Sequence, residues 1–279
     1  MTCLLETCAL GHIYADGSTA LVDCSLHIRR GSRNALLGVN GSGKTTLLQH
    51  LNGLLRPTSG RISFEGQPLD YGRTALNALR CRVGLVFQNP DHQLFSSNVY
   101  EDVSFGPLNL GLDASTVRQR VAAALAAVGM SELADKPVHH LSFGQKKRVC
   151  IAGVLAMQPD LLLLDEPMAG LDTPMQADLL AVLDRLSAGG ITILLATHDV
   201  DFAYRWADQL HLLAAGRCIA SFAAGDLPEH APALAVAGQK LPAVIDLHRA
   251  LLARGLVAAQ PVPRSLDALL ASLVPAGSR

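Results

Sequence analysis

The sequence predicts an α/β fold in which helices cover a mostly parallel β-sheet. Two observations support this prediction. Short apolar runs with the length of buried strands alternate with helical stretches from residue 35 onward, and a glycine-rich loop joins the first of these runs to a helix. The chain has 279 residues, of which 17% are charged, against ~25% in an ordinary soluble domain. We therefore expect one large domain with an appendage, or two small domains, with extensive buried or interfacial surface.

The N-terminal part is expected to contain two or three antiparallel strands, because apolar segments flank a turn-like Ala-Asp-Gly-Ser sequence at 15–18. These segments are Cys3–Leu10 and Leu21–Ile28. A helix is predicted at Thr46–Leu51, after the glycine-rich loop that follows the first strand of the parallel sheet. The apolar runs that predict this sheet are Ala35–Leu37, Val83–Phe87, Leu161–Leu164, Ile191–Ala196 and Gln209–Leu213.

The interval between Phe87 and Leu161 is too long for a single crossover between neighbouring strands. It contains helical patterns at Thr116–Val128 and Gly144–Met157. We therefore predict a helical insertion, over about 95–158.

The C-terminal part has a different composition. The Ala/Pro-rich segment Ala223–Gln239 is interpreted as a linker or irregular cover. Beyond it, capped amphipathic helices are predicted at Leu241–Arg254 and Ser265–Leu273. The expected division is a main domain at 1–222 and a small helical segment at 223–279.

Charge and composition exclude several classes of protein. The net charge is −1 and no run of five like charges occurs, so the sequence lacks the electrostatic pattern of a nucleic-acid-binding protein. No apolar stretch is long enough to cross a bilayer. The six cysteines include no C-x-x-C pair and the N-terminus lacks a signal segment, a pattern typical of reduced thiols in a cytoplasmic chain. The histidines are mostly isolated, so no metal site formed by them is expected.

A phosphate-binding loop is the strongest chemical signal. Residues 38–45 read Gly-Val-Asn-Gly-Ser-Gly-Lys-Thr, which fits G-x-x-x-x-G-K-[ST] between an apolar strand and a helix. The glycines let backbone N–H groups approach phosphate oxygens, and the helix N-terminus favours negative charge. Lys44 is expected to reach the β/γ-phosphates and Thr45 the Mg²⁺ ion. The predicted nucleotide-binding residues here are Asn40, Gly41, Ser42, Gly43, Lys44, Thr45 and Thr46.

Two adjacent acids, Asp165 and Glu166, follow the apolar run of four leucines. Buried carboxylates are costly unless they meet a cation or water, and ligands of α/β proteins bind at the carboxyl ends of parallel strands. Asp165 is therefore the expected Mg²⁺ partner, together with Thr45. Glu166 is the candidate that orients and polarises an attacking water.

The segment Leu141–Gln145, with the sequence Leu-Ser-Phe-Gly-Gln, resembles the LSGGQ signature of the ATPase subunits of ATP-binding-cassette (ABC) transporters. The resemblance extends from about residue 3 to 222. It implies a P-loop NTPase (RecA-like) ABC ATPase core with an N-terminal antiparallel β subdomain, a helical signature subdomain and a small C-terminal helical segment. It also implies that the chain hydrolyses ATP with Mg²⁺ as cofactor.

Further residues match motifs of this family in the family's order. Gln88 is similar to the Q-loop glutamine, a third expected contact of Mg²⁺, and Asp172 lies in a segment similar to the D-loop and is expected to bind nucleotide. His198 is similar to the switch histidine, which addresses the γ-phosphate. Tyr14 resembles the aromatic residue that stacks on adenine. The resemblance thus assigns catalysis to Glu166, His198 and Gln88.

In this family the signature segment faces the nucleotide held by the other subunit. The resemblance therefore implies a head-to-tail homodimer that encloses two ATP molecules, with Ser142, Gly144 and Gln145 contacting the partner's nucleotide. Phe143 stands where the family usually has glycine. We expect the closed dimer to turn this ring aside.

Within the family, Gln-Asn-Pro-Asp-x-Gln at 88–93 resembles the energy-coupling-factor branch of importers. The segment 141–148 and the C-terminal helices are similar to those of the cobalt and nickel members. This resemblance implies integral membrane and substrate-binding subunits as partners, and a peripheral location on the cytoplasmic face of the inner membrane. The C-terminal segment is expected to hold the dimer together.

Other functions remain open at this point. Vitamin importers of the same branch use related ATPases, often as two different chains, so a heterodimer competes with a homodimer. A non-transport ABC ATPase of DNA repair or ribosomes predicts basic surfaces, a coiled-coil insertion or fused cassettes, and the sequence shows none of these. A P-loop kinase would not need the signature segment or the acid pair.

Overall fold

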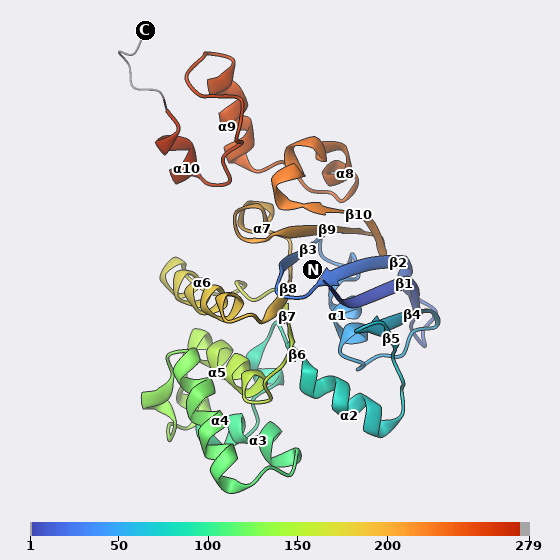
Figure 1. The fold of residues 1–279 in the computed structure, drawn as a ribbon, viewed down its shortest axis with the longest axis vertical. Helices are drawn as coiled ribbons and strands as arrows, with labels where there is room; N and C mark the ends of the chain where they lie inside the picture. Colours follow the sequence, from blue (N-terminus) through green and yellow to red (C-terminus); the bar gives the residue numbers. More distant parts are fainter. Residues whose placement is uncertain (1, 274–279) are drawn as a thin grey trace.

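Two β-sheets form the centre of the protein, and the computed structural model describes residues 2–273 of it (Figure 1). The N-terminal sheet is antiparallel, in the order β2 Thr19–Arg29, β1 Cys3–Ile13, β4 Ser59–Phe64 and β5 Gln67–Pro68. The central sheet has the order β10 Arg217–Ala223, β9 Gln209–Ala214, β3 Arg33–Leu37, β8 Thr192–Thr197, β7 Leu161–Asp165 and β6 Val83–Val86. All neighbouring pairs of the central sheet are parallel except β9 and β10.

The central strands are buried on both faces, as their continuous apolar runs predict. All residues of β6, β7 and β8 are buried. Along β3, Leu36 belongs to the core beneath the N-terminal sheet, whereas Ala35 and Leu37 belong to the larger core beneath the helices. This alternation follows from the two-residue period of a strand. The α/β prediction is therefore confirmed.

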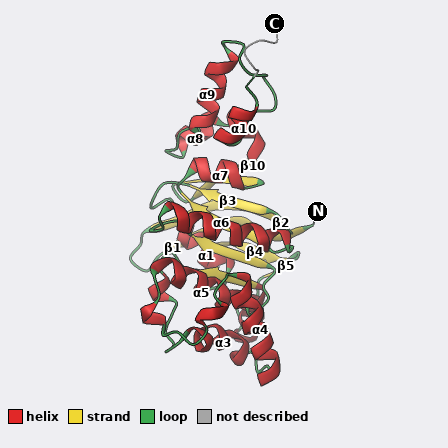
Figure 2. Ribbon diagram, turned by 90° about the vertical axis from the view of Figure 1, so that its left-hand side faces the viewer, coloured by secondary structure: helices red, strands yellow, loops and turns green. Residues whose placement is uncertain are grey.

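The helices are distributed over several parts of the molecule. The helix α1 follows β3 and contributes to the core under the N-terminal sheet. A helical region containing α3, α4 and α5 lies at one end of the molecule, and α9 and α10 lie at the opposite end (Figures 1 and 2). The bounds are α1 Lys44–Leu51, α2 Arg73–Arg82, α3 Val99–Asn109, α4 Ala114–Ala127, α5 Phe143–Leu155, α6 Thr173–Ala188, α7 Val200–Trp206, α8 Ala231–Val236, α9 Ala243–Leu252 and α10 Leu266–Ala271.

Three expectations need correction or extension. The segment 223–239 is not an irregular linker: it contains a 3₁₀ turn at Ala224–Glu229 and the helix α8, and its Leu227 and Leu234 are buried in the larger core. Several elements were not located by the sequence-based prediction, although α3 falls within the predicted helical insertion; they are α2, α3, α6, α7, β4, β5 and β10. The predicted C-terminal segment extends to 279, and its residues 274–279 lie outside the described part.

Within residues 2–273, no helix combines the length and the apolar character needed to cross a membrane. The carboxyl ends of β3, β6, β7 and β8 meet at one edge of the central sheet, since these strands are parallel neighbours. This edge carries the candidate site.

Candidate functional site

The phosphate-binding loop follows β3 and leads directly into α1, as predicted. Gly43 has φ +104°, and a Cβ atom there would come within 2.7 Å of the Ala20 carbonyl oxygen, so this position accepts only glycine. Lys44 is 6% exposed, and its Nζ donates to the carbonyl oxygens of Gly38 at 2.7 Å and Val39 at 3.2 Å. The loop therefore curls around its own lysine.

The acid pair at the end of β7 faces this loop. Thr45 Oγ1 donates to Asp165 Oδ2 at 2.6 Å, and Lys44 Nζ lies 3.4 Å from Glu166 Oε1. Asp165 is 5% exposed and Glu166 7% exposed. Burial raises the pKa of Asp165, the Thr45 hydroxyl lowers it, and the Glu166 charge raises it further. Two adjacent buried carboxylates therefore lie next to the phosphate loop, one bonded to Thr45 and the other beside Lys44.

These residues fit a magnesium ion. A hydroxyl, a carboxylate and the Gln88 amide line the same cavity, and all three offer the hard oxygen donors that Mg²⁺ prefers. A divalent cation would also relieve the cost of burying Asp165, whose neutral form is favoured by burial. These three groups are the donors that would hold the metal.

The backbone holds Glu166 in an unusual conformation. Its φ is +44°, in the left-handed region that non-glycine residues rarely adopt. The Glu166 N–H donates to the Ala196 carbonyl oxygen of β8 at 3.0 Å. His198, which follows β8, places its Nδ1 3.1 Å from Glu166 Oε2. The ends of β7 and β8 thereby bring a carboxylate and an imidazole together.

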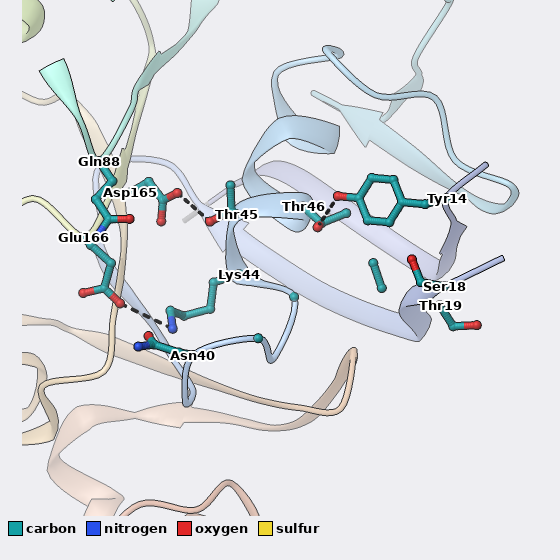
Figure 3. A pocket seen from close by; sticks show the side chains of 13 residues that line it. Tyr14, Ser18, Thr19, Asn40, Lys44, Thr45, Thr46, Gln88, Asp165 and Glu166 are labelled. Carbon is teal, nitrogen blue, oxygen red and sulfur yellow. Dashed lines mark hydrogen bonds and ion pairs between the residues drawn. The ribbon is translucent and has the colours of Figure 1, made fainter. Parts of the chain in front are cut away.

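A cavity of about 460 Å³ connects these groups to the N-terminal sheet (Figure 3). Tyr14, at the end of β1, lies at one side of it, and its Oη is 2.8 Å from Thr46 Oγ1. The acids and Gln88 lie at the other side, with Lys44 between (Figure 3). The residues that line the cavity are Tyr14, Ser18, Thr19, Ala20, Asn40, Gly41, Gly43, Lys44, Thr45, Thr46, Gln88, Asp165 and Glu166.

Sequence reasoning missed the lining residues Ser18, Thr19 and Ala20. The turn between β1 and β2 brings them to the same side as Tyr14. The available signal was that turn-like sequence itself, directly after the aromatic residue. It predicts a hairpin but not that the hairpin borders the cavity.

Other predicted site residues do not line this cavity. Ser42 is buried beneath the loop beside Gly38. Ser142 caps the N-terminus of α5 in a capping box: its Oγ accepts from the Gln145 N–H at 3.3 Å, and Gln145 Oε1 accepts from the Ser142 N–H at 3.0 Å. Asp172 caps α6 by accepting from the Met175 N–H. Four of the predicted nucleotide-binding residues thus lie outside the cavity of their own chain: Ser142, Gly144, Gln145 and Asp172.

This combination of a phosphate loop, an adjacent acid pair and a helical insertion that carries the signature segment defines a class of P-loop ATPases. The model of the ABC transporter family matches residues 21–169. The chain therefore belongs to the ABC transporter family, as an ATP-binding subunit that hydrolyses ATP.

The chain is 47% identical over 274 residues to the cobalt import ATP-binding protein CbiO of Rhodobacter capsulatus, covering 98% of each chain. It is 48% identical over 217 residues to the energy-coupling factor transporter ATP-binding protein EcfA3 of Clostridium perfringens, covering 77% of this chain and 76% of that protein.

Solved structures agree with these likenesses. CbiO1 of Clostridium perfringens, part of the ABC transporter complex CbiONQ, superposes with a TM-score of 0.77 at 42% identity, covering 91% of this chain and 96% of that one. The cassette MJ0796, a dimer bound to ADP and phosphate after hydrolysis, gives a TM-score of 0.72 at 25% identity, covering 79% of this chain and 99% of that one. The ABC ATPase fold that the resemblance implied is confirmed.

Proposed function

We propose that this chain is the ATP-hydrolysing subunit of an energy-coupling-factor importer for cobalt or nickel ions. The observation that carries this proposal is the identity of 47% with a cobalt import ATPase over 98% of both chains. The alignment extends beyond the ATPase core into the C-terminal helices, whose sequence other ABC ATPases need not share. The transported ion is the substrate of the membrane partners, so no site for it is required on this chain.

The cavity residues divide the work of ATP hydrolysis. Tyr14 offers an aromatic face to adenine, and the loop N–H groups with Lys44 bind the phosphates. Thr45, Asp165 and Gln88 would hold Mg²⁺, which supplies charge neutralisation for the phosphate oxygens. Glu166 accepts a hydrogen bond from the attacking water and orients it. His198, bonded to the Glu166 carboxylate, donates toward the γ-phosphate.

We further propose that the working unit is a head-to-tail homodimer. Its support is the position of Ser142, Gly144 and Gln145 at the start of α5, outside the cavity of their own chain. A second copy can bring the same N-terminus to this cavity, where its N–H groups favour a phosphate. The dimeric state of the related cassette MJ0796 agrees with this arrangement.

A second cavity offers a surface to the membrane subunits. It has about 290 Å³ and is lined by residues of β6, of α3 and of the C-terminal half of α5, and by Phe87 and Gln93 on either side of Gln88. Phe95 and Phe105 stand exposed at its rim, with ring centroids 4.7 Å apart. An exposed apolar pair of this kind suits an apolar segment of a partner. Docking there would place the chain peripherally on the cytoplasmic face of the inner membrane.

The C-terminal helices are proposed to strengthen the dimer. One side of α9 packs on the protein through Val244 and Ile245. Other large apolar side chains of the segment remain exposed, which favours a further partner surface. They are Val236, Leu247, Leu252, Leu256, Leu266, Leu270 and Leu273.

A vitamin importer of the same branch is the second candidate, because the identity of 48% with EcfA3 matches that with CbiO over a shorter span. The two are separated by co-expressing the chain with the membrane subunits encoded beside it and measuring ATP-dependent uptake of labelled cobalt, nickel and vitamins. The proposal is supported if the wild-type transporter takes up cobalt or nickel and the Glu166→Gln variant does not. Uptake of a vitamin alone would assign the second function.

A further inference from the structure

A buried lysine outside the predicted site contacts the loop that carries Glu166. Lys147, in the second turn of α5, is 3% exposed. Its Nζ donates to the carbonyl oxygens of Ala169 at 2.6 Å, Pro167 at 2.7 Å and Glu166 at 3.3 Å. An ammonium group has three protons, so the three carbonyls account for all of them. Buried charges persist only when they are paired in this way.

The bonds of Lys147 go to the backbone of Glu166 and not to its carboxylate. The carboxylate lies beside Lys44 and His198 instead. Lys147 therefore does not serve as the counter-ion of the acid in a direct contact. What it fixes is the peptide group from which the Glu166 side chain extends.

That peptide group needs support, because Glu166 has the left-handed φ of +44°. Strained conformations persist only where the surroundings hold them. The Glu166 N–H is held by the Ala196 carbonyl of β8. Its carbonyl oxygen accepts from Lys147 Nζ and from the Ala169 N–H at 3.1 Å. The residue is thus held on both sides, by a strand and by α5.

Phe143, which replaces the usual glycine of the signature segment, also contacts Lys147. The ammonium of Lys147 lies 5.2 Å from the centroid of the Phe143 ring, within the range of a cation–π interaction. The same ring lies against Gly170, where an added Cβ would come within 2.9 Å of Phe143 Cε1. Phe143 therefore covers both the lysine and the end of the loop.

We propose that Lys147 is a positioning residue for ATP hydrolysis. From α5 it holds residues 166–169, and so determines where the Glu166 carboxylate lies relative to Lys44 and His198. This inference rests on the proposed role of Glu166 in hydrolysis. Ser142 caps the helix that carries Lys147. A displacement of α5 at the signature segment therefore also displaces residues 166–169.

The charge of Lys147 is sensitive to pH. Burial lowers the pKa of Lys147 to about 8, and the charge of the Glu166 carboxylate opposes this shift. The other ionisable groups at this end of the loop, Lys44 and His198, both face the Glu166 carboxylate. Above pH 8 the neutral amine has only two N–H groups for three carbonyls, so the hold on the loop weakens.

The test compares three variants of the full-length protein. Lys147→Met keeps the length of the side chain and removes every donor, whereas Lys147→Gln retains an amide with two. Lys146→Met is the matched control: it removes one charge from the same helix, and Lys146 bonds Asp91 rather than the loop. We expect Lys147→Met to lower kcat about 10- to 100-fold through misplacement of Glu166, with the KM for ATP changed less than about threefold.

We expect Lys147→Gln to recover part of the lost kcat, and Lys146→Met to retain wild-type kcat. The wild-type kcat should fall above about pH 8, and Lys147→Met should lack this fall. A kcat of Lys147→Met equal to that of Lys146→Met overturns the proposal, and so does an equal loss in the Met and Gln variants. If Lys147→Met does not fold, a wild-type kcat in Lys147→Gln or a flat wild-type profile from pH 7 to 9 overturns it.

A Glu166→Gln variant separates this inference from the function on which it rests. If Glu166→Gln still hydrolyses ATP, the proposed role of Glu166 fails. If Glu166→Gln is inactive while the Lys147 variants behave as wild type, only the inference on Lys147 fails.

Discussion

Lys44 Nζ lies 3.4 Å from Glu166 Oε1, and the two side chains are 7% and 9% exposed. The pair joins the phosphate loop to the end of β7 across 122 positions of sequence, which brings the expected phosphate-binding cation beside the expected catalytic acid. The two residues are nevertheless assigned different tasks. Substitutions of each should therefore separate binding from chemistry.

Replacing Lys44 by Ala should weaken ATP binding, because the phosphates lose the cation that the loop curls around. Hydrogen bonds to charged groups contribute about 1.5–3 kcal/mol, which corresponds to a Kd about 10- to 100-fold higher. Equilibrium binding of a fluorescent ATP analogue measures the change. An unchanged Kd would remove Lys44 from phosphate binding.

Replacing Glu166 by Gln should spare ATP binding and lower turnover by ~10²–10⁴, since an amide cannot accept the proton of the attacking water. The same variant should accumulate ATP-bound dimers. Single-turnover hydrolysis and size-exclusion chromatography with ATP measure the two effects. Hydrolysis at the wild-type rate would show that another group acts on the water.

Mixing His198→Ala chains with Ser142→Ala chains tests the head-to-tail dimer. If His198 acts on its own chain's nucleotide and Ser142 on the partner's, both lesions fall in one composite site of the mixed dimer and the other site stays intact. We then expect the mixture to have more ATPase activity than either variant alone. Crosslinking of Ser142 to Lys44 within one chain would contradict the arrangement.

Acid should destabilise the protein through two buried histidines. Burial lowers the pKa of His50 to about 4, assisted by His12, and burial likewise lowers the pKa of His211 to about 4. Between pH 6.5 and 4 the unfolded chain therefore binds protons that the folded chain does not. The free energy of unfolding should fall as the pH decreases through this range, and not above it.

Urea unfolding of wild-type protein and a His50→Asn variant at pH 7, 6 and 5 measures this dependence. Asn keeps a donor for the Leu55 carbonyl, which lies 3.1 Å from His50 Nδ1, but it does not titrate. The variant should lose less stability on acidification than the wild type. An equal loss of unfolding free energy in the two proteins would show that His50 does not take up a proton on unfolding.

Truncation after Gln239 tests the C-terminal helices and leaves α8 in place, since Leu234 of α8 is buried in the larger core. We expect normal ATP binding and a smaller dimer fraction without ATP, because the exposed leucines of α9 and α10 are removed. Light scattering of both proteins without nucleotide measures the fraction. Equal fractions would mean that the helices serve only their own subunit.

The parts of the fold that the sequence predicted have strong local signals. The strands β3 and β6–β9 are continuous apolar runs bounded by polar residues, and α4 and α5 have a clear helical period. The helix α3 lacks such a signal because Gly106 and Pro107 fall inside it. In α8, Pro232 at the start of the helix was taken for part of a linker, although proline is favoured at that position.

The sequence by itself determined the phosphate loop, the acid pair and the signature segment, because the geometry of each depends on residues adjacent in the chain. The tertiary structure alone decided which of them meet. His198 reaches Glu166 only because β8 lies beside β7, and Lys147 reaches the loop after β7 only because α5 packs against the central sheet. These contacts depend on strand order and helix packing, which motif spacing does not encode. For the same reason the left-handed backbone of Glu166 became visible only in the folded chain.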